Sequence, residues 1–120
     1  MSIPRIPEGE YRFCLIMWEH EPVSTLELVK LCQEKLAWKR TTTYTVLKRL
    51  SERGLFANEG GIVRSLVGRE EFYSKKSESI VNESFGGSLP AFIASFTRGR
   101  NLSEKEISEI EAMIEQIKRR

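Results

Sequence analysis

The first 54 residues contain three short stretches in which apolar side chains recur at helical spacing, and this pattern limits the fold more than any other feature. Residues 7–19 carry the first stretch. Ser24 then opens a capping box, which predicts a second helix over residues 25–36. The third stretch begins near Arg40 and stops at Gly54, a residue suited to a left-handed helix C-cap. Helices this short bury their apolar faces against one another, so we expect a compact three-helix core.

A hairpin signal follows the third helical stretch. The segment LFANEGGIVRSLV places Asn58, Glu59, Gly60 and Gly61 between two short apolar runs, and such residues supply the positive φ angles that a tight hairpin turn requires. Two strands after three helices are typical of a winged helix-turn-helix. We therefore predict a mainly α (α+β) fold with a winged-helix DNA-binding domain over residues 1–68 and a helical dimerisation domain over residues 69–120.

The predicted C-terminal helices carry narrow apolar stripes. The last helix, opened by a second capping box at Ser103, repeats isoleucine at intervals of three and four, a seam that suits a partner helix. Stripes that would be exposed in a monomer favour a homodimer, because the same surface on a second copy would cover them. The residues assigned to dimerisation are Tyr73, Ile80, Val81 and Phe85, and the seam Ile107, Ile110, Ile114 and Ile117.

Basic charge is concentrated around the third helix, although the net charge of the chain is only +2. With Thr43, Val46, Leu47 and Leu50 turned inward, the outer surface would present short hydroxyl side chains first and cations further along. A helix that enters the major groove needs small side chains where it meets base edges and basic ones where it passes phosphates. The residues predicted to bind DNA are Lys39, Arg40, Thr41, Thr42, Tyr44, Thr45, Lys48, Arg49 and Arg53, with Arg64 of the wing. The alternative is that the threonines cap the helix and the cations are merely solvated.

Several classes of function have no signal in the sequence. Cys14 and Cys32 lie within apolar patterns, without a Cys-x-x-Cys pair and with a single histidine in the chain, so we expect buried thiols in a reducing cytoplasm and no metal site. No nucleophile motif, paired carboxylates in an apolar setting or phosphate-cradling glycine loop indicates an enzyme or a cofactor. No segment approaches the roughly 18 apolar residues of a membrane span, so we expect no membrane insertion.

Five segments of the chain together resemble the penicillinase-repressor family of bacterial winged-helix regulators, which includes the methicillin-resistance and copper-responsive repressors. They are EGEYRFCLIMWEHEP, WKRTTTYTVLKRLSERGL, SLVGREEF, FGGSLPAFIASF and LSEKEISEIEAMIEQI. The resemblance implies a homodimeric transcriptional repressor that reads a dyad-symmetric operator. It also implies a membrane sensor of β-lactams and inactivation by proteolysis in the C-terminal region.

The chain departs from the family pattern in three places. Its wing is shorter and lacks the aromatic, tyrosine-rich strand. Ser95 and Phe96 stand where the β-lactam-responsive members carry an Asn-Phe cleavage pair, and they mark the candidate cleavage region. The tail lacks the cysteine-rich motif of the copper-responsive branch, so we expect no copper sensing. The alternative function is a winged-helix module that binds protein and not DNA.

Overall fold

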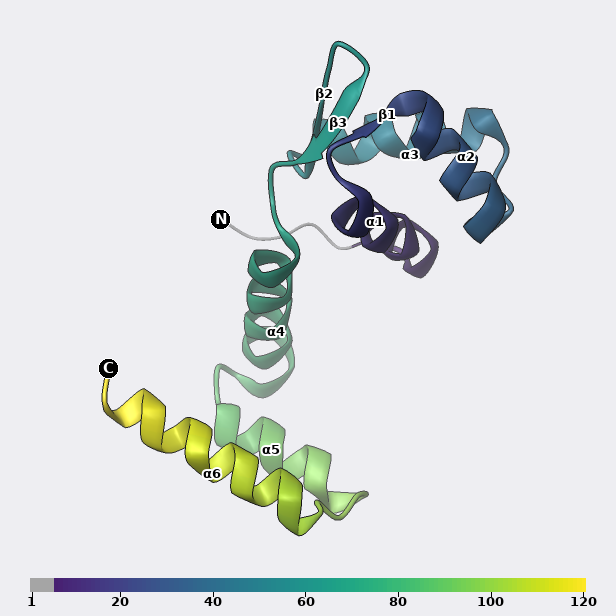
Figure 1. Cartoon of the computed structure of the whole chain (residues 1–120). Helices are drawn as coiled ribbons and strands as arrows, with labels where there is room; N and C mark the ends of the chain where they lie inside the picture. The colour runs from purple at the N-terminus through teal and green to yellow at the C-terminus, as the bar shows by residue number, and fades with distance from the viewer. Residues whose placement is uncertain (1–5) are drawn as a thin grey trace. The chain divides into compact units, whose positions relative to one another are not determined.

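The computed structural model describes residues 6–120, which form six helices and a three-stranded sheet in two compact units (Figure 1). The elements are α1 (Glu8–His20), β1 (Val23–Ser24), α2 (Thr25–Leu36), α3 (Arg40–Glu52), β2 (Phe56–Glu59), β3 (Ile62–Ser65), α4 (Arg69–Phe85), α5 (Leu89–Arg98) and α6 (Glu104–Lys118). The first unit ends at Ser77 and the second begins at Glu78. These helices and the small sheet confirm the predicted mainly α fold with a winged helix-turn-helix.

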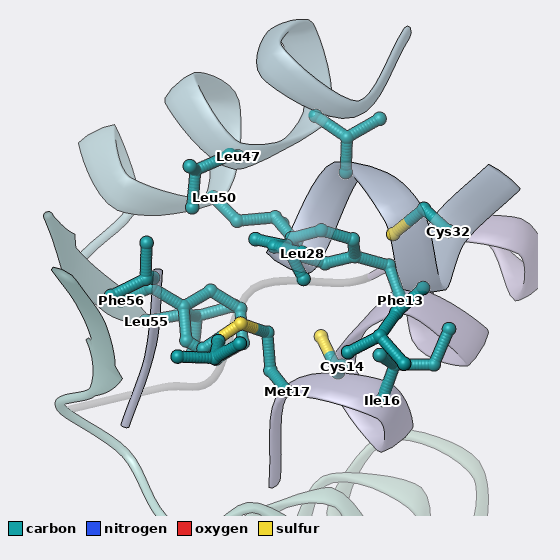
Figure 2. Close-up of a cluster of buried hydrophobic side chains, with 14 of the residues drawn as sticks. Phe13, Cys14, Ile16, Met17, Leu28, Cys32, Leu47, Leu50, Leu55 and Phe56 are labelled. Carbon is teal, nitrogen blue, oxygen red and sulfur yellow. The ribbon is translucent and has the colours of Figure 1, made fainter. Parts of the chain in front are cut away.

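The core of the first unit lies between α1, α2, α3 and the sheet (Figure 2). Phe13, Met17, Leu28 and Leu50 are completely buried there, and each such side chain contributes about 1.5–3 kcal/mol through removal from water. Cys14 is also buried, and both cysteines of the chain are free thiols. The apolar stripes of the first three helical stretches therefore meet in one core, as predicted.

Local signals explain where the first helices begin and end. The Ser24 hydroxyl accepts a hydrogen bond from the Glu27 backbone N–H at 3.1 Å and so caps α2. Gly54, with φ +84°, follows the end of α3 in the expected left-handed conformation. The end of α2 is less predictable, because its left-handed cap is Ala37, with φ 57°, a conformation that a side chain normally disfavours.

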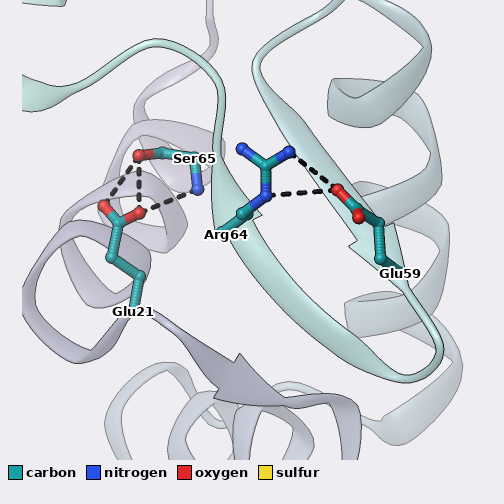
Figure 3. Close-up of polar contacts among 4 residues, drawn as sticks. All are labelled: Glu21, Glu59, Arg64 and Ser65. Carbon is teal, nitrogen blue, oxygen red and sulfur yellow. Dashed lines mark hydrogen bonds and ion pairs between the residues drawn. The ribbon is translucent and has the colours of Figure 1, made fainter.

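The sheet has the strand order β1-β3-β2 and is antiparallel throughout. Asn58 and Val23 both pair with Val63, so β3 lies between the other two strands. The sequence predicted the β2–β3 hairpin but not β1, which has only two residues and therefore no alternating pattern to recognise. The Glu21 carboxylate holds the base of the wing by accepting the Ser65 backbone N–H at 2.8 Å and the Ser65 hydroxyl at 2.6 Å (Figure 3).

The first half of α4 completes the first unit. Phe72 is 2% exposed, with its ring 5.2 Å from that of Trp18 and 6.2 Å from that of Tyr11. The Trp18 indole N–H donates to the Val67 carbonyl at 3.0 Å, which fixes the chain just before α4. The compact unit therefore continues beyond the predicted domain boundary after residue 68, because the core needs the aromatic side chains of α4.

The second unit is built from the end of α4, α5 and α6. The Phe92 ring lies edge-on to Phe85 at 5.4 Å, and Ser103 and Glu106 form the predicted capping box of α6. No residue of α5 or α6 is buried in the single chain. Across the described part of the chain, no helix is both long enough and apolar enough to cross a membrane.

Candidate DNA interface

Helix α3 divides its residues between the core and the surface as the sequence predicted. Thr43, Val46, Leu47 and Leu50 are buried. The outer surface of α3 is formed by exposed residues, namely Thr41, Thr42, Tyr44, Thr45, Lys48 and Arg49. Because α3 follows α2 after only three residues and packs on α2, it occupies the position of the second helix in a helix-turn-helix.

The threonines at the start of α3 do not act as its cap. The N-cap residue is Lys39, which makes no side-chain capping hydrogen bond, and Thr41 and Thr42 lie within the first turn. Their hydroxyls make no hydrogen bond with another residue of the described range 6–120. They are therefore available to a ligand at the end of the helix where backbone N–H groups and the helix dipole favour anions.

The cations predicted to meet phosphates differ in what surrounds them. Within residues 6–120, the ammonium groups of Lys39 and Lys48 have no hydrogen-bonding or ion-pair partner, and both side chains are exposed. The Arg40 guanidinium lies over the Tyr44 ring, 5.6 Å from its centre, which leaves its positive charge uncompensated. Arg53 is exposed just after α3. These residues keep a positive surface on α3.

Two of the predicted phosphate contacts are paired within the protein. Arg49 forms an ion pair with Glu10, a buried carboxylate of α1 that the sequence reasoning missed. Arg64 donates to the Glu59 carboxylate across the hairpin, at 2.7 Å from Nη2 and 3.1 Å from Nε (Figure 3). Each pair compensates the charge that the sequence reasoning assigned to phosphate, so these two arginines differ electrostatically from Lys48.

A surface groove of about 510 Å³ continues the outer surface of α3 towards the wing. It lies between α3 and β2 and is lined by Tyr44, Leu47, Lys48, Ser51, Glu52 and Asn58. The lining contains both a cation, Lys48, and a carboxylate, Glu52, and both belong to α3.

The residues predicted for dimerisation fall in both units. Tyr73 is half-buried and packs against Tyr11 in the first unit, where their hydroxyls are hydrogen-bonded. In the second unit Ile80 is 43% exposed, whereas Val81 and Phe85 are half-buried. The α6 seam of Ile107, Ile110, Ile114 and Ile117 is 39–54% exposed, and a groove of about 400 Å³ lies beside it, with walls from α5 and α6.

The candidate cleavage residues lie inside a helix. Ser95 and Phe96 belong to α5 and are exposed, but the Phe96 ring is 6.3 Å from Phe92 and is covered by the Arg100 guanidinium at 5.4 Å.

No cluster of metal-binding side chains occurs among residues 6–120.

Comparison with known proteins agrees with this architecture. The sequence model of the penicillinase repressor matches residues 6–116. A penicillinase repressor of Bacillus licheniformis is 27% identical over 123 residues, a match that covers 99% of this chain and 96% of that protein. The solution structure of monomeric Bacillus licheniformis BlaI with the blaP half-operator matches in fold, with a TM-score of 0.51, 24% identity and coverage of 58% of this chain and 90% of that one. The chain thus belongs to the penicillinase repressor family.

Proposed function

We propose that the chain is a DNA-binding transcriptional repressor that acts as a homodimer in the cytoplasm and reads a dyad-symmetric operator through α3. The observation that carries the proposal is the outer surface of α3, where exposed threonines precede Lys48, a cation that has no partner among residues 6–120. Its residues suit a major groove because threonine contacts bases with a hydroxyl and a methyl group, while lysine and arginine contact phosphates.

The residues of this proposed interface have different roles. Thr41, Thr42 and Thr45 would meet base edges, whereas Lys39, Arg40, Lys48 and Arg53 would neutralise phosphates. Tyr44 would lie at the edge of the groove that runs to the wing. Arg49 and Arg64 would contribute less to phosphate binding, because each already has a carboxylate partner.

The homodimer would form through the second unit. The exposed isoleucine seam of α6 and the neighbouring α5 groove offer apolar surface that a second copy would cover. Two linked DNA-binding units raise each other's effective concentration at adjacent half-sites, which strengthens binding by about 10²–10⁴ over a single unit. Loss of the second unit would therefore release the operator.

Release by proteolysis, as the family resemblance implies, would require α5 to unfold locally. A protease takes its substrate in an extended conformation, whereas Ser95 and Phe96 lie within a hydrogen-bonded helix. A membrane sensor or another signal would act by promoting the local unfolding of this helix. Cleavage within residues 89–98 would separate the DNA-binding unit from α6 and so abolish the advantage of two linked half-sites.

The test is a DNA titration with the full chain. A duplex is first enriched from a random library by the protein, and its affinity is compared with that of a scrambled duplex at one fixed salt concentration. A repressor should prefer the enriched duplex by about 10³-fold or more, with weak, salt-sensitive binding to the scrambled one. Equal or absent binding to both duplexes would instead favour the protein-interaction module.

A further inference from the structure

Glu10 is a buried carboxylate in the first unit. It lies on α1, is 5% exposed, and with Thr43 makes up the buried polar residues of the described range 6–120. A charged group out of contact with water is costly unless a counter-charge compensates it. A carboxylate at such a position on α1 therefore requires a cationic partner.

That partner is Arg49 on α3. One guanidinium nitrogen of Arg49 contacts Glu10 Oε1, while Glu10 Oε2 is buried without a hydrogen bond to any other described residue. The Arg49 side chain remains 47% exposed, so it reaches from the surface of α3 to the carboxylate of α1. The pair is a polar link between the first helix and the proposed recognition helix.

Arg49 also has a defined place relative to the threonines. It lies four residues after Thr45 and seven after Thr42, a spacing that puts all three on one side of α3. Together with the buried side chains of α3, the ion pair at Arg49 therefore fixes the direction in which that side points. Polar contacts of a binding site require orientation to within about 10–20°, so a small rotation of α3 about its axis would misalign the threonines.

Phosphate binding by Arg49 would break this link. If its guanidinium turned to DNA, Glu10 would remain buried without a counter-charge. Lys48, the adjacent residue, is exposed and has no partner within residues 6–120, so it meets a phosphate without that cost. The sequence predicted a phosphate contact for both cations, but in the structure only Arg49 has a carboxylate partner.

We propose that Glu10 is a positioning residue for DNA recognition: it holds Arg49 and thereby sets the orientation of α3, while Arg49 itself does not neutralise a phosphate. This inference rests on the proposed function as a DNA-binding repressor. Glu10 acts without touching DNA, through Arg49.

The test measures two quantities for the full chain. One is the affinity ratio between the enriched and the scrambled duplex, and the other is the salt slope, the dependence of log K on log salt concentration for the scrambled duplex. Glu10→Gln should lower the affinity ratio tenfold or more without reducing the salt slope. The matched control Lys48→Gln should reduce the salt slope by about two in a dimer, one per half-site.

Variants of Arg49 complete the test. Arg49→Gln should lower the affinity ratio without reducing the salt slope, and Arg49→Lys should recover most of that ratio because it keeps a cation beside Glu10. Since Arg49→Gln also leaves a buried carboxylate unpaired, its folding is checked by tryptophan fluorescence. If Arg49→Gln fails to fold, the affinity ratio of Glu10→Gln alone tests the inference, because that variant leaves only a half-exposed arginine in contact with water.

Two results would overturn the inference. An affinity ratio within twofold of wild type in Glu10→Gln would make the pair a structural contact only. A salt slope reduced by about two in Arg49→Gln would make Arg49 a phosphate ligand. A wild-type chain with no preference for the enriched duplex would refute the proposed function itself, and the inference with it.

Discussion

Replacing Phe72 with alanine should destabilise the first unit severely. The Phe72 side chain is 2% exposed and lies against the rings of Trp18, Tyr11 and Tyr73 at 5.2, 6.2 and 6.2 Å. Truncation of a phenylalanine buried in this way costs about 3–5 kcal/mol in lost burial and cavity formation. A unit that ends at Ser77 has roughly 4–12 kcal/mol of stability at 0.05–0.15 kcal/mol per residue, so a large share would be lost.

The assay is urea unfolding of the full chain followed by tryptophan fluorescence. Trp18 and Trp38 are the two tryptophans of the chain and both lie in the first unit, so the signal reports that unit alone. The matched control is Leu26→Ala on α2, where the side chain is 68% exposed and the expected change is within about 0.5 kcal/mol. A loss below about 1 kcal/mol for Phe72→Ala would show that the start of α4 is not part of the DNA-binding unit.

Three further predictions concern specificity, assembly and the buried thiols. Thr42→Ala or Thr45→Ala should cost about 1–3 kcal/mol per half-site for the enriched duplex and leave scrambled-duplex affinity nearly intact, as measured by fluorescence anisotropy. Ile114→Asp, which places a charge in the exposed α6 seam, should yield a monomer in analytical ultracentrifugation with operator affinity reduced about 10²–10⁴-fold. Burial raises the pKa of Cys14 to about 12 from 9.0, so iodoacetamide at pH 8 should alkylate it only after unfolding, and stability should fall as pH rises above about 9.

The pattern of α3 was readable from the sequence because it depends on local periodicity. A helix that buries one side must expose the other, so the spacing of Thr43, Val46, Leu47 and Leu50 also determined which threonines and cations are exposed. The same reasoning predicted the caps of α2 and α6, where a serine hydroxyl satisfies a backbone N–H three residues later.

Contacts between distant segments were not readable in this way. The ion pair of Glu10 with Arg49 joins residues 39 positions apart, and nothing in the local pattern of either helix distinguishes Glu10 from a solvated carboxylate. The extension of the first unit into α4 was missed for a similar reason, because the partners of Phe72 lie on α1. The Arg64–Glu59 pair could have been inferred from the predicted hairpin, because its members are diagonal neighbours on paired strands.

Hydroxyl-radical footprinting of the full chain on the enriched duplex tests most directly whether two copies of α3 read DNA. Two copies held by one dimer should protect two equivalent segments related by two-fold symmetry, with centres one helical turn of about 10–10.5 base pairs, or a multiple of it, apart. Lys48→Gln should weaken both protected segments equally at the same protein concentration. A single protected segment, or protection that does not depend on sequence, would contradict the account.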